Sequence, residues 1–289
     1  MAIRFRIVHH TEYRYGSTVT SGYTIARLTP RALPHQQVHH STVVTEPPPD
    51  TVRVHEDGFG NTVTYIGLER PHDHLVVTAE SEITLVEPVW PSGGPAWDEV
   101  PGLLGLDADG LLARACALGS PLASPSDALR AYAEPSFPPG RPVDEAAGDL
   151  SARIHRDFAF DPEFSEVQTP LAEVLAHRRG VCQDFAHLLV ACMRSLGLPA
   201  RYVSGYLETA PPPGQPRLVG SDASHAWCSV YVPEQGWLDL DPTNDHLRPD
   251  RHVTVAWGRD YDDVAPVRGV VYGPPTPQTL HVSVDVART

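Results

Sequence analysis

Residues 179–185 read Arg-Gly-Val-Cys-Gln-Asp-Phe and open a segment with the spacing of a buried helix. From Phe185 onwards, apolar residues recur in the i, i+3, i+4, i+7, i+11 pattern of a helix that buries one face. Gly197 is well placed as the C-terminal cap of this helix, and a proline two residues later cannot continue it. The pattern predicts a helix from about Val181 to Leu196, with Cys182 in its first turn.

The position of Cys182 at a helix start favours a reactive thiol. The first turn of a helix carries N–H groups without intrahelical partners and the positive end of the helix dipole, and both stabilise a negatively charged sulfur. Only the thiolate is a strong nucleophile. A core cysteine that happens to begin a helix gives the same local pattern, so Cys182 alone leaves both interpretations open.

Two strand-like segments downstream supply a base and a carboxylate. Residues 224–227 read Ser-His-Ala-Trp, and residues 236–243 read Gly-Trp-Leu-Asp-Leu-Asp-Pro-Thr. In the strand predicted over 224–232, His225 shares a face with Trp227, while the opposite face has the composition of a core. A thiol, an imidazole and a carboxylate that orients the imidazole are the minimum set for nucleophilic acyl transfer.

A surface position is the simpler explanation of any one histidine here, because the chain has 15 of them. His187 lies on the helix predicted for Cys182, five residues further on, and is expected to point elsewhere. His177, His246 and His252 lie in segments without a companion signal. We therefore predict His225 as the base.

The carboxylate could belong to Asp239 or Asp241, which share a face of the predicted strand 237–241. A plain four-residue loop between the two strands would put Asp241 on the wrong face, whereas a three-residue loop would place it opposite Trp227 and diagonal to the histidine. Gly236 could allow the required irregularity by adopting a positive φ. The structural alternative for these aspartates is an Asp-Pro turn that ends the strand.

The remaining chain divides into a β-rich part and a mixed part. The N-terminal part has the period-two alternation of half-buried strands and no helical period before residue 88, which favours a β-sandwich. Helices and then strands follow a linker-like stretch, so the fold class expected is α+β. We predict an N-terminal antiparallel β-sandwich domain over 1–95 and a core over 96–289 with helices packed on an antiparallel sheet. A linker is expected over 88–102, and helices over 103–118, 126–134 and 142–158. The strand expected over 278–287 could pack on either domain.

Composition limits the class of partner. The chain has 289 residues and a net charge of −14, which argues against nucleic acid or an anionic membrane as the main partner. The N-terminus shows neither a long apolar run nor a cleavage site, and no stretch approaches the ~18 apolar residues of a membrane span. We expect a cytoplasmic protein whose partner is a peptide or protein substrate, while its oligomeric state stays open.

The sequence shows no pattern typical of a cofactor or metal site. The four cysteines form no C-x-x-C pair, so neither a zinc ribbon nor a disulfide framework is expected. A calcium-loop pattern around residues 107–110 fails because its first and last ligand positions lack a carboxylate. Zinc held by Cys182, His225 and Asp241 is a further hypothesis, since thiolate, imidazole and carboxylate can all bind it. We expect Cys116, Cys192 and Cys228 to be buried and inert.

The combination of Gly-Val-Cys-x-Asp-Phe, Ser-His-Ala-Trp and Gly-Trp-x-x-Leu-Asp-Pro-Thr resembles the transglutaminase-like superfamily. The match is closest to a bacterial branch whose members are often described as cysteine proteases. Further segments resemble the family outside these blocks, including a β-rich domain ahead of the core in bacterial members. They are His-Thr-Glu-Tyr-Arg-Tyr at 10–15, Leu-Thr-Pro-Arg at 28–31, Asp-Gly-Phe-Gly-Asn at 57–61, the segment 198–206 and Gly-Arg-Asp-Tyr-Asp-Asp-Val at 258–264.

The resemblance implies a papain-like core and a set of roles. Cys182 would be the nucleophile, His225 the base and Asp241 the residue that orients it, because the family's aspartate precedes the Pro-Thr pair. The substrate would be a peptide or a glutamine side-chain amide, transferred through a thioester, with hydrolysis expected over cross-linking. Neither a calcium site nor zinc-binding cysteine pairs are carried over. The alternative is a non-catalytic peptide- or protein-binding module that keeps the fold.

Overall fold

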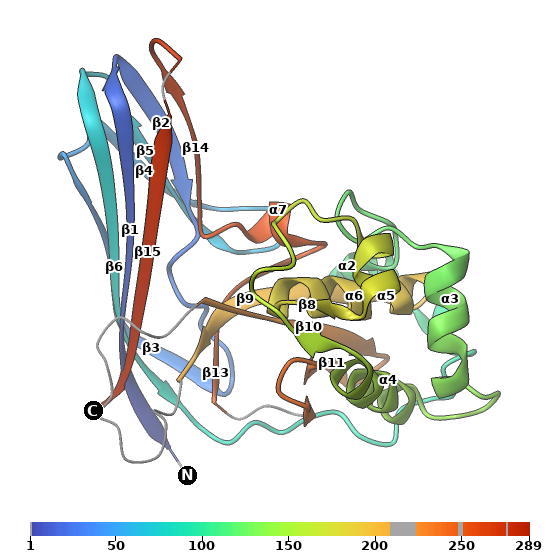
Figure 1. Ribbon diagram of the computed structural model, residues 1–289. Helices are drawn as coiled ribbons and strands as arrows, with labels where there is room; N and C mark the ends of the chain where they lie inside the picture. The colour runs from blue at the N-terminus through green and yellow to red at the C-terminus, as the bar shows by residue number, and fades with distance from the viewer. Residues whose placement is uncertain (1, 209–223, 248–250, 276) are drawn as a thin grey trace, which may run out of the picture.

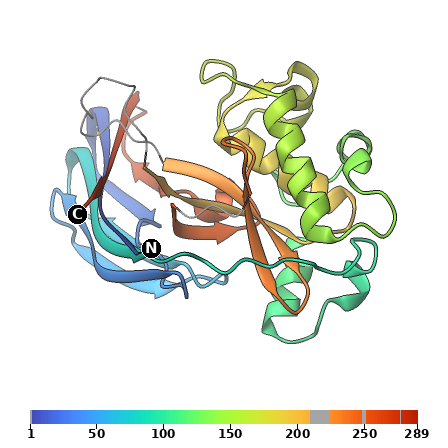
Figure 2. The same cartoon turned by 90° about the horizontal axis from the view of Figure 1, so that it is seen from below.

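The structure, a computed structural model, describes residues 2–208, 224–247, 251–275 and 277–289. A β-sandwich forms one end of the molecule and a bundle of helices the other, with a further sheet between them (Figures 1 and 2). The proline-rich stretch 210–216, expected from its composition to be an exposed loop, lies outside the described residues. No helix in the described part of the chain is both long and apolar enough to cross a membrane.

The first sheet of the sandwich has the order β15-β1-β6-β3, with every neighbour antiparallel. Its long strand β1 alternates buried residues such as Phe5 and Ile7 with exposed ones, as the period-two pattern predicts. The strands are β1 (Ile3–Val19), β3 (Gln36–Glu46), β6 (His72–Leu85) and β15 (Gln278–Arg288).

The second sheet has the order β14-β2-β5-β4 and is also antiparallel. An apolar cluster that includes Leu28, Ile66, Leu75 and Val77 fills the space between the two sheets, so the predicted sandwich is confirmed. The strands are β2 (Ser21–Ala26), β4 (Thr51–Glu56), β5 (Thr62–Leu68) and β14 (Val267–Tyr272).

The last two strands of the chain belong to these N-terminal sheets. β15 pairs with β1 along its whole length, and β14 pairs with β2, although both fall inside the range 96–289 predicted for the core. The strand predicted over 278–287 therefore packs on the sandwich. Where the two domains divide stays a prediction, and the chain crosses between them twice.

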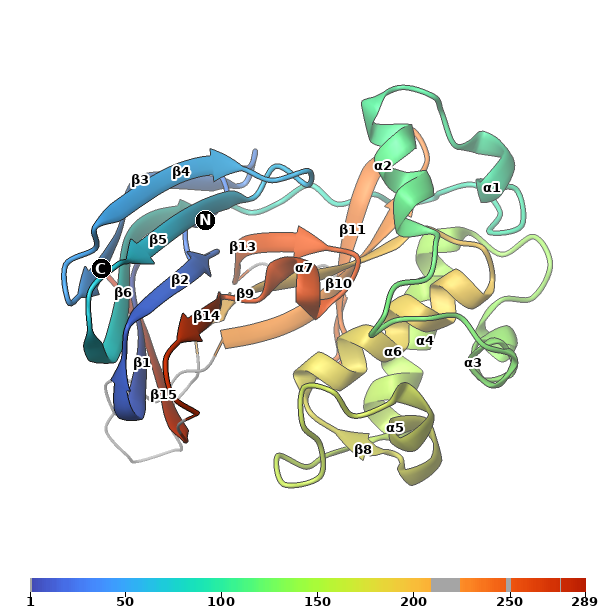
Figure 3. The same ribbon diagram turned by 90° about the horizontal axis from the view of Figure 1, so that it is seen from above.

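The sheet of the core has the order β12-β11-β10-β9-β13 and is antiparallel. Helix α6 (Cys182–Ser195) packs on β10 and β9, and α4 (Val143–Asp157) packs on β10 and β11 (Figure 3). The predicted α+β class is confirmed. The strands are β9 (Ala200–Leu207), β10 (Ser224–Val232), β11 (Gly236–Asp241), β12 (His246–Leu247) and β13 (His252–Gly258).

Shorter elements surround this core. Asp107 begins α2, because its side chain accepts the N–H of Gly110 at 2.9 Å, so it serves as a helix cap. The helices predicted over 103–118 and 126–134 are shorter than expected. The elements are α1 (Val100–Leu103), α2 (Ala108–Cys116), α3 (Asp127–Ala133), the 3-10 turn η1 (Glu134–Ser136), α5 (Leu171–His177), α7 (Tyr261–Val264) and the parallel pair β7 (Ala159–Phe160) and β8 (Arg179–Gly180).

Two apolar clusters hold the core. One lies between the helices and the sheet and contains the buried cysteines Cys192 and Cys228. The other joins Tyr202 and Val253 of the core sheet to Phe5 and other residues of the first sandwich sheet. The burial expected for Cys116, Cys192 and Cys228 is confirmed.

Candidate active site

Helix α6 begins at Cys182, one residue from the predicted start, and ends one residue before the predicted end. Asp184 fixes this start, since its Oδ2 accepts the backbone N–H of Val181 at 2.8 Å. The first intrahelical bond runs from the N–H of Phe185 to the carbonyl of Val181, so the N–H of Cys182 has no partner within the helix. Cys182 is half-buried, unlike the three other cysteines.

The hairpin between β10 and β11 has the irregular geometry that the sequence predicts for Asp241. Val232 pairs with Gly236, which leaves a loop of three residues, and both Glu234 and Gly236 have positive φ, at 65° and 96°. Cys228 then pairs with Leu240, so the next position along β11, Asp241, falls opposite Trp227.

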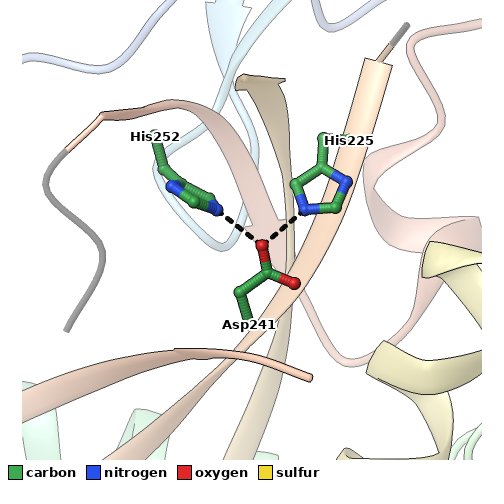
Figure 4. Close-up of side chains that lie close together, drawn as sticks. All are labelled: His225, Asp241 and His252. Atoms are coloured by element: carbon green, nitrogen blue, oxygen red, sulfur yellow. Dashed lines mark hydrogen bonds and ion pairs between the residues drawn. The ribbon is translucent and has the colours of Figure 1, made fainter. Parts of the chain in front are cut away.

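This register brings Asp241 to His225. The Nε2–H of His225 donates to Oδ2 of Asp241 at 2.8 Å, and the Asp241 side chain is fully buried (Figure 4). The other oxygen, Oδ1, accepts the backbone N–H groups of Thr243 and Asn244 at 2.9 and 3.3 Å. Asp241 therefore forms the strand-ending turn and is also hydrogen-bonded to the histidine.

The Cys182 side chain acts on the same histidine. Burial opposes a charge on His225, but hydrogen bonding to Asp241 and Cys182 and the negative charges of both raise the pKa of His225 to about 10. Because Nε2 faces Asp241, Nδ1 is the ring nitrogen that remains for the thiol; it points away from Asp241 (Figure 4). The structure thus brings together all three predicted site residues.

The carboxyl of Asp241 is held as an anion. Burial alone would raise its pKa, but hydrogen bonds from His225 and His252 and the charge of His225 outweigh burial and hold the pKa well below the usual range. Asn244 adds a further donor, with its Nδ2–H at 2.8 Å from Oδ2.

His252 is the residue that sequence reasoning missed. Its Nε2–H donates to the same Oδ2 of Asp241 at 2.8 Å, and burial lowers the pKa of His252 (Figure 4). The view that His252 has no companion is wrong. The β-branched residues that follow His252 are a signal that could have predicted a strand here, but the pairing of that strand with β9, which brings His252 to the site, leaves no local signal.

Asp239 has a different set of partners from Asp241. Its Oδ2 accepts the indole N–H of Trp227 at 2.9 Å, and its Oδ1 accepts the hydroxyl of Ser229. Trp227 in turn stacks beside His225, with ring centroids 6.1 Å apart and an angle of 28° between the planes. Asp239 therefore bonds to Trp227, a neighbour of His225, and to Ser229.

The same cluster has the chemistry of a metal site. Among the described residues, the group that could hold a metal ion is His225, Asp241 and His252, whose ligand atoms lie within 4.8 Å of one another. Cys182, a member of the zinc hypothesis, is not part of this group. In this geometry both imidazole Nε2 atoms point their protons at Asp241, so a cation would have to replace two hydrogen bonds.

Comparison with known proteins assigns the family. Residues 5–84 match the model of the bacterial transglutaminase-like N-terminal region, and residues 130–242 match the transglutaminase-like superfamily. An uncharacterized protein of Mycobacterium tuberculosis is 43% identical over 291 residues, which cover 98% of this chain and 92% of the relative. The chain belongs to the transglutaminase-like superfamily. The resemblance drawn from the sequence motifs is therefore confirmed.

Two further similarities are to a solved structure and to a named enzyme. A crystal structure of a candidate cysteine protease from Cytophaga hutchinsonii superposes with a TM-score of 0.74, covering all of this chain and 91% of that one at 20% identity, which shows a shared fold. A protein-glutamine gamma-glutamyltransferase of Pseudomonas aeruginosa is 42% identical over 67 residues, which cover 23% of this chain and 10% of that protein.

Proposed function

We propose that this transglutaminase-like protein is a cysteine enzyme that transfers the acyl group of an amide through a thioester on Cys182. The observation that carries the proposal is the row formed by Cys182, His225 and Asp241, in which one imidazole interacts with the thiol and donates to the buried carboxylate. The substrate proposed is a peptide bond or a glutamine side-chain amide, in keeping with the family and with the named relatives.

The first half-reaction forms the thioester. The Nδ1 atom of His225 takes the thiol proton, and the raised pKa of His225 keeps the imidazolium charged beside the thiolate. The sulfur then attacks the amide carbon, and the N–H of Cys182 at the helix start is suited to stabilise the oxyanion that forms. The imidazolium gives its proton to the amide nitrogen, the carbon–nitrogen bond breaks, and the amine or ammonia leaves.

The second half-reaction releases the acyl group. His225 removes a proton from water, the oxygen bonds to the thioester carbon, and the carbon–sulfur bond breaks to restore the thiol. A primary amine in place of water gives transamidation. We propose hydrolysis as the main outcome, because Cys182 is only half-buried and water can approach it.

Mass spectrometry of glutamine-containing proteins and peptides, incubated with the purified enzyme, tests this function. Cleavage, deamidation and incorporation of an added primary amine give three different mass changes. We expect hydrolytic changes with the wild-type protein and none with Cys182→Ala, whose fold should be preserved because the removed sulfur is only half-buried. Equal turnover by both proteins would refute the role of Cys182, and substrate capture without turnover would identify a binding module.

A further inference from the structure

We propose that His252 is a positioning residue for the carboxylate of Asp241, and that the N-terminal sandwich holds His252 in place through strand β13. This inference rests on the proposed function, because it concerns the geometry of the same Cys182–His225–Asp241 row. It also assigns a role to the N-terminal domain.

Three donors converge on one oxygen of Asp241. The Nε2–H groups of His225 and His252 and the Nδ2–H of Asn244 each lie 2.8 Å from Oδ2. A carboxylate only accepts hydrogen bonds, so Nε2 of His252 must carry the proton. Because His252 approaches from the side opposite His225, it holds the carboxylate against rotation (Figure 4).

The ring of His252 is itself tightly held. Its side chain is 3% exposed, and its ring packs edge-on against Trp227, with centroids 4.9 Å apart and an angle of 86° between the planes. Trp227 is fixed by its bond to Asp239. Nδ1 of His252 is buried without a hydrogen-bond partner among the described residues, as suits the neutral tautomer, so His252 brings an N–H group and no charge.

The sandwich forms hydrogen bonds with β13 at Thr254, two residues after His252. β13 is an edge strand of the core sheet, and its pairing with β9 is irregular between Thr254 and Ala256. The Gln36 side chain binds the backbone of Thr254, because its Oε1 accepts the N–H of Thr254 at 2.9 Å and its Nε2–H donates to the carbonyl of Thr254 at 2.7 Å. The N–H of Arg31 also donates to that carbonyl, at 3.1 Å.

A second amide of the sandwich repeats this arrangement further along β13. The Nδ2–H of Asn61 donates to the carbonyl of Trp257 at 2.8 Å, and its Oδ1 accepts the N–H of Trp257 at 3.0 Å. Gln36 and Asn61 are both buried, at 1% and 0% exposure. Moving β13 would leave these buried amide groups without hydrogen-bond partners, which costs free energy. The two amides therefore fix β13, and with it His252, relative to the sandwich.

Substitution of His252 tests the first half of the proposal. His252→Phe keeps an aromatic ring against Trp227 but removes the donor, and should lower kcat about 10-fold with little change in KM, since a bond to a charged group is lost. His252→Gln restores an N–H donor and should recover part of the rate. His281→Phe, at an exposed histidine of β15, is the matched control and should equal the wild type.

Substitution of Gln36 tests the role of the sandwich. Gln36→Leu removes both bonds to Thr254 at similar side-chain size, whereas Gln37→Leu changes the exposed neighbour on the same strand. We expect the first variant to lower kcat and the second to leave it unchanged, with thermal unfolding measured for both to show that each is folded.

A spectroscopic readout separates this proposal from the proposed function. The downfield proton resonance of the His225 Nε2–H reports its bond to Asp241 whether or not a substrate turns over. A shift or broadening of that resonance in His252→Phe and Gln36→Leu, with none in the controls, would support the positioning role even for a protein that showed no turnover. Either an unchanged resonance or a wild-type kcat in His252→Phe would overturn the proposal. Neither result would contradict the function proposed for Cys182.

Discussion

Asp241 ends a strand and orients a histidine with the same carboxylate. Its Oδ1 accepts backbone N–H groups of the turn that follows, while its Oδ2 accepts side-chain donors from strands β10 and β13 and from Asn244 of that same turn. The folded protein thereby keeps the pKa of Asp241 low, so the carboxylate stabilises the fold above about pH 4 and this contribution is lost as the pH falls through the folded pKa.

Asp241→Asn tests this residue directly. The amide keeps the size of the carboxyl but presents an N–H toward donors, so the tautomer and orientation of His225 should be disturbed. We expect kcat to fall by about 10²- to 10⁴-fold while alkylation of Cys182 remains possible. The matched control is Asp245→Asn, since Asp245 is exposed and its φ of 53° suits asparagine. An unaltered rate in the Asp241 variant would exclude an orienting role.

The hairpin between β10 and β11 is the element that sets the position of Asp241. The loop has three residues, one fewer than the plain four-residue loop considered from the sequence. This difference in length decides which face of the sheet the aspartate occupies. Gly236 allows this register because its φ of 96° lies in a region that side chains disfavour.

Gly236→Ala isolates this backbone effect, because a Cβ at this position would meet no atom within 4 Å. We expect a loss of about 1–2 kcal/mol in the free energy of unfolding, together with slower alkylation of Cys182. Gly58→Ala is the control, since a Cβ there also meets nothing within 4 Å and its φ is not positive. Equal stability of the two variants in thermal or denaturant unfolding would show that the register does not depend on Gly236.

Local patterns in the sequence predicted the parts of the site that depend on neighbouring residues. The apolar spacing after Cys182 located the start of α6. The three-residue hairpin was predicted because Asp241 needs it to face His225, and Gly236 was expected to allow it. These features follow from helix and strand periods, which short segments reveal on their own.

Long-range pairing could not be predicted in the same way. The period-two pattern of 278–287 predicted a strand but not which sheet receives it, because alternation specifies a buried face and leaves the neighbouring strand open. His252 was missed for the same reason: β13 reaches the site only through its pairing with β9 and its bonds to Gln36.

In the whole molecule, the sandwich and the core sheet meet at the edge strand β13. The sandwich packs its first sheet on the core through an apolar cluster, and its buried amides bind the backbone of β13. Arg31 of the sandwich and Arg201 of the core both stack on Trp257, each 3.6 Å from the ring centroid, which adds a cation–π contact across the junction. The sandwich is therefore bonded to the strand that carries His252.

The pH dependence of Cys182 alkylation by iodoacetamide, mapped by peptide mass spectrometry, tests the central claim most directly. The label should be selective, because Cys116, Cys192 and Cys228 are buried. Since the pKa of His225 is raised to about 10, its imidazolium persists through the neutral range and stabilises the thiolate. We expect rapid labelling of the wild type at neutral pH and, in His225→Gln, labelling only in the alkaline range where an ordinary thiol ionises. Identical alkaline profiles for the two proteins would contradict the pairing of Cys182 with His225.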